Sequence, residues 1–209
     1  MKTTISVLTL VMLFYLSYGQ TKADEPANVP VWTEADRKYL LDNLIRSKEE
    51  LIAETKDLTK EQWNFKESPD RWSINQIVEH ICLWEVVQQD QISKSLQIGP
   101  ISSFTNYYPD SVFIEKDTER LEKTVTTDYS KPFTYGVPLG NNEGENNMIW
   151  YTTMTNESID FLQSTDANLR VHYIYFVSNI HQKYMVFFQH TFRHLGQIRE
   201  VKKHQKYPK

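Results

Sequence analysis

Four stretches of this chain repeat apolar residues every three to four positions, which is the spacing of an α-helix that buries one face. They cover roughly residues 33–58, 73–96, 146–163 and 179–203. Four helices of this length, joined mostly by long connections, are typical of a helical bundle. With only 6 glycines in 209 residues, the chain is poorly suited to a sheet fold rich in tight turns. The sequence therefore predicts one all-α domain, a four-helix bundle.

Capping residues mark where two of these helices begin. Thr33 is followed three residues later by Asp36, and Ser73 is followed three residues later by Gln76. In such a capping box, each side chain satisfies a backbone N–H group that the first helical turn leaves without a partner. We therefore expect helices to begin at residues 33 and 73, and we expect Gly99 to end the second.

The segment between the second and third helices, residues 101–142, is interrupted by prolines and ends in a polar run. We expect a long irregular insertion there, a type of connection that often has a function of its own. Within it, residues 112–114 and 124–127 fit short strands, because β-branched and aromatic residues prefer strands. Residues 169–176, which precede the fourth helix, fit either a short strand or an extended linker.

The N-terminus has the parts of a secretory signal peptide. Lys2 supplies a positive charge, a short apolar run follows, and small residues precede a cleavage point after Gly19. We expect residues 1–19 to be removed, residues 20–32 to form a flexible leader, and residues 33–209 to form the folded domain. The apolar run is short for a membrane span, although an uncleaved anchor is the alternative. The expected location is secreted or periplasmic, without stable membrane insertion.

Charge and cysteine content narrow the function classes. Lys plus Arg is 23 and Asp plus Glu is 27, which gives a formal net charge of −4. No basic surplus exists to neutralise a phosphate backbone, so we expect no nucleic-acid binding. The single cysteine, Cys82, excludes an internal disulfide and any multi-cysteine metal site. Its place in a helical pattern predicts that it is buried.

Three histidines make the most informative pattern. His190 and His194 are four residues apart, so both imidazoles lie on one face of the fourth helix and can point at one centre. His80 lies within the apolar stripe of the second helix, where its ring nitrogens need partners. The three together predict a metal site with an open coordination position, as in catalytic zinc centres. The alternative is three ordinary residues, because an H-x-x-x-H pair alone is a weak signal.

The other titratable residues receive weaker assignments. No His-Glu-x-x-His pattern occurs, so the metalloprotease signature is absent. Glu79 and Glu85 lie on the second helix but point to other faces than the histidine, so we expect neither to be a general base. The remaining histidines are expected at the surface or in loops; they are His172, His181 and His204.

Two segments resemble a known family. Residues 71–81 resemble the W-S-x-x-x-x-x-x-H segment of DinB-like proteins, and residues 190–198 resemble their H-T-x-R-H-x-x-Q-I segment. The similarity extends over roughly residues 33–208. It implies a four-helix bundle of DinB-like type, with one metal-binding histidine on the second helix and two on the fourth. The ligands that it implies are His80, His190 and His194.

The same resemblance implies one bound divalent metal ion, zinc or nickel. Members of the DinB-like family include metal-dependent hydrolases and thiol S-transferases. Because small thiols are mainly intracellular, the signal peptide favours an exported hydrolase of an unknown small molecule. The alternatives are a metal-dependent S-transferase and a binding protein in which the metal is structural. Family members often dimerise, which leaves a homodimer open.

Three further residues of the two motifs receive roles. Arg193 lies about 100° from His194 around the helix, so we expect it to point away from the metal and to pair with a carboxylate. Gln197 is either the hydrogen-bond partner of a ligand histidine or a polar residue at the bundle end. Trp72 is expected to pack at the N-terminal edge of the second helix.

Overall fold

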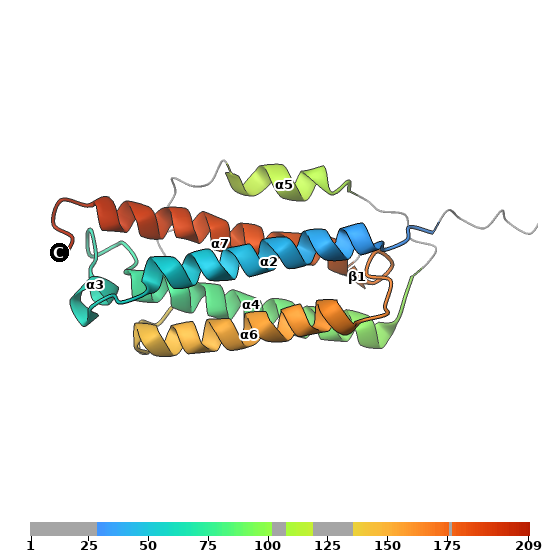
Figure 1. The fold of residues 1–209 in the computed structure, drawn as a ribbon, viewed down its shortest axis with the longest axis horizontal. Helices are drawn as coiled ribbons and strands as arrows, with labels where there is room; N and C mark the ends of the chain where they lie inside the picture. Colours follow the sequence, from blue (N-terminus) through green and yellow to red (C-terminus); the bar gives the residue numbers. More distant parts are fainter. Residues whose placement is uncertain (1–28, 102–107, 119–135, 176) are drawn as a thin grey trace, which may run out of the picture.

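The computed structural model describes residues 29–101, 108–118, 136–175 and 177–209. The expected signal peptide and most of the leader lie outside these ranges. The described chain is mostly helical (Figure 1). Its long helices are α2 (Glu34–Thr55), α4 (Ile74–Ile98), α6 (Gly144–Ser164) and α7 (Ile180–Lys203). The described connections contain α3 (Lys60–Asn64), α5 (Ser111–Thr118), and an antiparallel ribbon of β1 (Tyr173–Ile174) and β2 (Ser178–Asn179).

The long helices pack as a four-helix bundle, which confirms the predicted fold class. Both α2 and α4 pack against α6 and α7, so each helix has two close neighbours. In Figure 1, α2 and α7 run in one direction, and α4 and α6 run in the other. Because α4 and α6 are parallel, the chain between them must return along the length of the bundle. This return path, residues 99–143, accounts for the long insertion, and we call it the crossover.

The helix starts are capped as predicted. The hydroxyl of Thr33 accepts a hydrogen bond from the N–H of Asp36, and the carboxylate of Asp36 accepts one from the N–H of Thr33. Ser73 and Gln76 form the same reciprocal pair at the start of α4, and Gly99 ends that helix with a φ of 93°. Capping boxes also start α3 and α7. These boundaries are therefore set locally by the sequence.

The described part of the crossover contains a helix that was not predicted. Residues 112–114, expected as a short strand, belong to α5, and Phe113 packs against the core beside α7. An apolar run of three residues fits a helical turn as well as a strand, and packing against α7 decides between them. The expected strand at 124–127 lies outside the described residues. Within residues 169–176 a strand does form, although it is only the two-residue β1.

The bundle interior consists of two apolar clusters with a polar layer between them. Leu44 and Tyr184 belong to one cluster, and Leu51 and Leu195 belong to the other. Along each long helix, a buried polar residue lies between the two. These residues are Ser47 of α2, Glu85 of α4, Thr155 of α6 and Thr191 of α7. Because Thr191 directly follows a predicted ligand histidine, this polar layer adjoins the predicted metal site.

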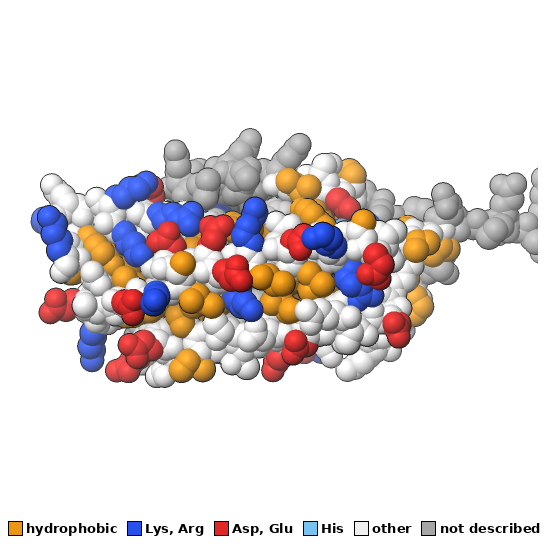
Figure 2. All heavy atoms as spheres, viewed as in Figure 1, with side chains coloured by type: hydrophobic (Ala, Val, Ile, Leu, Met, Phe, Trp, Pro, Cys, Tyr) orange, Lys and Arg blue, Asp and Glu red, His pale blue; other side chains and the backbone are white. Residues whose placement is uncertain are grey.

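The surface drawn in Figure 2 carries acidic and basic side chains interspersed with one another. Arg199 of α7, for example, contacts Glu50 and Glu54 of α2 at 3.0 and 2.6 Å. This face therefore has no continuous patch of one charge. Among the described helices, none is both long and apolar enough to cross a membrane.

Candidate metal centre

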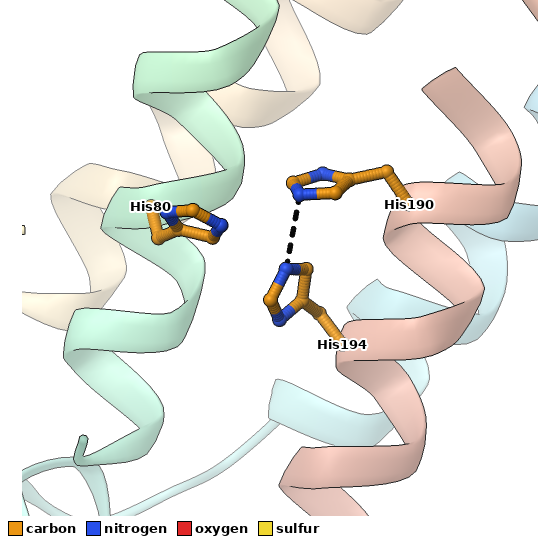
Figure 3. Close-up of side chains that lie close together, drawn as sticks. All are labelled: His80, His190 and His194. Atoms are coloured by element: carbon orange, nitrogen blue, oxygen red, sulfur yellow. Dashed lines mark hydrogen bonds between the residues drawn. The ribbon is translucent and has the colours of Figure 1, made fainter. Parts of the chain in front are cut away.

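The three predicted ligand histidines meet in the bundle interior (Figure 3). His80 comes from the beginning of α4, whereas His190 and His194 come from consecutive turns of α7. Each residue offers one ring nitrogen, and the three nitrogens all lie within 4.8 Å of one another. The Nε2 atoms of His190 and His194 are 3.0 Å apart. Packing of α4 on α7 thus joins the single histidine to the pair.

Gln197 orients His194. Its side-chain oxygen lies 2.7 Å from Nδ1 of His194, one turn earlier on α7. An amide oxygen only accepts hydrogen bonds, so Nδ1 carries the hydrogen and Nε2 keeps its lone pair for the cluster. Of the two alternatives for Gln197, the structure therefore supports the one in which it partners a ligand histidine.

The crossover orients His80. The Nδ1–H group of His80 donates to the backbone carbonyl of Gly136, which leaves the other ring nitrogen pointing toward the α7 pair (Figure 3). The ring of Trp72 packs against the imidazole, with centroids 4.8 Å apart. Trp72 lies just before the start of α4, as predicted, and it is buried. His80 is thus held by a hydrogen bond and by contacts with the rings of Trp72 and Trp84.

Position 136 requires glycine. Its φ is 74°, and a Cβ atom there would lie 2.6 Å from the indole of Trp84 and 3.3 Å from Nδ1 of His80. The carboxylate of Glu79 holds the same part of the crossover, because it accepts hydrogen bonds from the N–H groups of residues 139–140 at 3.2 and 2.7 Å. No sequence motif predicted this role for Gly136.

Burial favours the neutral form of all three imidazoles. It lowers the pKa of His80 to about 4, although the hydrogen bond to Gly136 acts in the opposite direction. Burial also lowers the pKa of His190 and His194 well below the ordinary value, and the neighbouring cationic groups lower it further. His190 keeps some accessible surface because it borders a cavity. Neutral imidazoles with converging lone pairs are suitable metal ligands.

The donor set fits a divalent metal ion. Zinc–nitrogen bonds of about 2.1 Å in a tetrahedral site separate two ligand nitrogens by about 3.4 Å, which lies between the 3.0 and 4.8 Å found here. Within the described ranges, no further histidine, cysteine, aspartate or glutamate joins the cluster. Cys82 is buried as predicted, and its Sγ lies 3.4 Å from the carbonyl of Asn147. Three nitrogens suit zinc or nickel and leave coordination positions for other molecules.

A cavity of about 170 Å³ reaches the cluster at His190. Glu85 and Gln88 of α4 are among its lining residues. The hydroxyl of Thr155 lies 3.2 Å from both carboxyl oxygens of Glu85. Burial raises the pKa of Glu85 to about 8, against the effect of that hydrogen bond. Glu85 was predicted to point to another face of α4 than His80, and His80 is not among the residues that line this cavity. Packing of α7 on α4 nevertheless brings Glu85 and His190 to the same cavity.

Arg193 also differs from its prediction. It does not point away from the histidines: its Nη2 lies 3.3 Å from Nε2 of His194. The long, flexible side chain compensates for the 100° or so between neighbouring positions on a helix. Arg193 borders the same cavity and brings a positive charge to it.

His181 was expected at the surface or in a loop, but it is buried in the first turn of α7. The indole N–H of Trp32 donates to Nδ1 of His181 at 3.2 Å, and a carboxylate oxygen of Asp110 lies 3.6 Å from its Nε2. Both partners come from segments distant in sequence, so the position of His181 on its helix could not predict its burial. His172 does lie in a loop, although it is buried, and His204 is half-buried just after α7.

Comparison with known proteins identifies the family. The sequence profile of the DinB superfamily matches residues 43–198. This range covers most of the chain and includes all three clustered histidines, so the chain belongs to the DinB superfamily. The resemblance seen in residues 71–81 and 190–198 is confirmed. No curated protein and no solved structure matches the chain significantly.

Proposed function

We propose that this DinB-superfamily protein is a metal-dependent hydrolase of small molecules, with His80, His190 and His194 as the metal ligands. The observation that carries this proposal is the cavity that reaches His190, beside a set of three donor nitrogens with no fourth protein ligand in the described part of the chain. Structural zinc sites are normally closed by four protein ligands, whereas catalytic sites keep a position that water or substrate can reach. The combination of three ligands and an adjoining cavity favours catalysis.

The residues around the site orient the ligand histidines. When bound, a zinc or nickel ion would act as a Lewis acid and lower the pKa of coordinated water. Gln197 and Gly136 determine which ring nitrogens of His194 and His80 face the centre. Such outer hydrogen bonds fix the tautomer and the ring orientation of metal ligands. Trp72 covers His80 and limits access of water from that side.

Elemental analysis of the purified chain tests the metal site. The protein is produced without a polyhistidine tag and offered zinc, nickel and other divalent ions. We expect about one metal ion per chain in the wild type, and loss of that metal in His190→Ala and His80→Ala. His204→Ala, which removes a histidine outside the cluster, should retain it. Absence of metal from the wild type, or its retention in folded His190→Ala and His80→Ala, contradicts the proposed site.

Turnover assays test the reaction class. The metal-loaded protein is offered ester, amide and phosphate-ester substrates, with and without small thiols. Product formation that needs only water supports hydrolysis. Product formation that requires a thiol replaces this proposal with S-transfer. Tightly bound metal, without turnover of any substrate class and without ligand binding in the cavity, favours a structural metal.

We also propose that the protein is exported and cleaved after Gly19. The support is the order of Lys2, the apolar run and the small residues before the cleavage point. N-terminal sequencing of protein recovered from the medium or the periplasm should begin at Gln20. Recovery of the intact N-terminus from membranes contradicts cleavage and favours an anchor.

A further inference from the structure

The cavity beside His190 has a polar wall that metal binding does not use. Glu85 and Gln88 lie one turn apart on α4, and both line the cavity. The side chain of Gln88 is buried, with 3% of the residue exposed, and no donor in the described part of the chain reaches its Oε1. A buried acceptor without a partner is costly and rare in native proteins. Gln88 therefore indicates a ligand that brings a hydrogen to donate.

Glu85 supplies the complementary group. It is buried, and the hydroxyl of Thr155 lies 3.2 Å from both of its oxygens. In the metal-free protein burial raises its pKa to about 8, which favours the protonated carboxyl. A protonated carboxyl both donates and accepts hydrogen bonds. One turn of α4 thus presents an acceptor at Gln88 and a donor at Glu85.

The rest of the cavity sets the size of the ligand. Its remaining walls are largely apolar and include Ile81, Trp84 and Phe187. The volume is about 170 Å³, close to the engineered cavity of about 150 Å³ that holds benzene. The cavity therefore accepts a group no larger than about one aromatic ring with a small substituent.

We propose that this cavity binds a small carboxamide group of the substrate, with an amide N–H donating to Oε1 of Gln88 and the amide C=O accepting from Glu85. The inference rests on the proposed function, since it names the substrate class for that same site. An amide is the simplest group that carries the required donor and acceptor side by side. Its substituent then packs against the apolar wall.

Other small ligand groups form fewer hydrogen bonds with Gln88 and Glu85 than an amide does. A carboxylate has no hydrogen for Gln88. An alkylammonium has no acceptor for Glu85, and it meets the positive charge of Arg193. An apolar ligand leaves both polar groups unpaired. Because sites with buried polar groups reject ligands that leave them unpaired, the cavity should discriminate among these classes.

Calorimetric titration of the purified chain with benzamide, benzoate and toluene tests this inference. We expect benzamide to bind more tightly than benzoate. Gln88→Leu should weaken benzamide binding about tenfold, the effect of losing one hydrogen bond, and should leave toluene binding unchanged or stronger. Gln91→Leu is the matched control, because Gln91 lies on the same helix, its buried oxygen is also unpartnered within the described chain, and it does not line the cavity.

Three results overturn the inference: no benzamide binding by the folded wild type, tighter binding of benzoate, or equal benzamide binding by Gln88→Leu. Circular dichroism verifies that each variant folds. If Gln88→Leu does not fold, Gln88→Met, which preserves the length of the side chain, takes its place. Metal content is measured on the same samples. If the wild type holds metal but does not bind benzamide, only this inference is overturned. If it binds benzamide but holds no metal, the proposed hydrolase is overturned and the amide-binding cavity stands.

Discussion

The side-chain oxygen of Gln197 lies 2.7 Å from Nδ1 of His194, so a residue outside the histidine cluster determines which nitrogen of that histidine faces the cluster. Gly136 has the same effect on His80 through its backbone carbonyl. One of these partners lies on the same helix as its histidine, and the other comes from the crossover. The geometry of the site therefore depends on two hydrogen bonds of different structural origin.

Gln197→Leu should weaken metal binding by about 10- to 100-fold, the usual effect of removing an outer hydrogen bond to a ligand. Without its partner, His194 loses the constraint on its tautomer and ring orientation. Competition with a chromophoric chelator measures the affinity. Gln189→Leu is the control, because this buried amide lies on the same helix but lines a different cavity. Equal affinities in the two variants contradict an orienting role for Gln197.

Gly136→Ala should both destabilise the fold and weaken metal binding. The new Cβ would meet the indole of Trp84 at 2.6 Å and displace the carbonyl that holds His80. Gly99→Ala provides the control, since Gly99 also has a positive φ but has open space where a Cβ would lie. We expect a cost of about 1–3 kcal/mol for Gly99→Ala, from backbone strain alone, and a larger cost for Gly136→Ala, where steric overlap adds to the strain. Urea denaturation and chelator competition measure the two effects, and unchanged metal affinity in Gly136→Ala would contradict the role of the carbonyl.

Glu85 should make the free energy of unfolding fall as pH rises. Burial raises the pKa of Glu85 from an ordinary 4.5 to about 8 in the folded protein. Between these two values the folded state keeps a proton that the unfolded chain has released, so raising the pH favours unfolding. The contribution over the whole range is a few kcal/mol, because one pKa unit corresponds to about 1.4 kcal/mol.

Urea denaturation of the metal-free protein at pH 5 and pH 8 isolates this contribution. The buried histidines, whose pKa values are lowered, favour folding as pH rises, and they act alike in both proteins. The test is therefore the difference between the proteins: from pH 5 to pH 8, the stability of Glu85→Gln should change more favourably than that of the wild type. Asp90→Asn, which removes an exposed carboxylate from the same helix, should follow the wild type. If Glu85→Gln also follows the wild type, Glu85 does not keep its proton in the folded bundle.

Arg170→Met should destabilise the protein by about 2–4 kcal/mol. The guanidinium of Arg170 is largely buried and contacts the carboxylates of Asp36 and Asp110 at 2.7 and 3.0 Å, so its removal leaves both without that partner. Thermal denaturation measures the loss. Lys38→Met removes a solvent-exposed ion pair with Asp42 instead and should change stability by less than about 0.5 kcal/mol. Similar losses in the two variants would show that the Arg170 contacts contribute no more than a surface pair.

Local features of the fold could be predicted from sequence because their causes are local. Thr33 and Ser73 satisfy N–H groups within the next turn, and the four-residue spacing of His190 and His194 places both on one face whatever packs against it. His80 could be assigned because it interrupts an apolar stripe. The structure confirms the two helix starts and brings the three histidines together.

The features that could not be predicted depend on which segments meet in space. Gly136 has no sequence signal for its contact with His80, since the crossover must first return along the bundle. Glu85 was placed by the geometry of its own helix, but the arc of α4 that α7 covers determines what lies beside it. His181 is buried by Trp32 and Asp110, neither of which is near it in sequence.

The parallel course of α4 and α6 has a consequence for the order of events during folding. Because the crossover separates α4 from its partners, its contacts with α6 and α7 join distant parts of the chain, and contacts of this kind form slowly. His80 meets His190 and His194 only after α7 has docked. We therefore expect a metal ion to bind the completed bundle and not a partly folded chain in which α7 is undocked. Interactions absent from the transition state mainly slow unfolding, so metal should lengthen the lifetime of the native protein more than it accelerates folding.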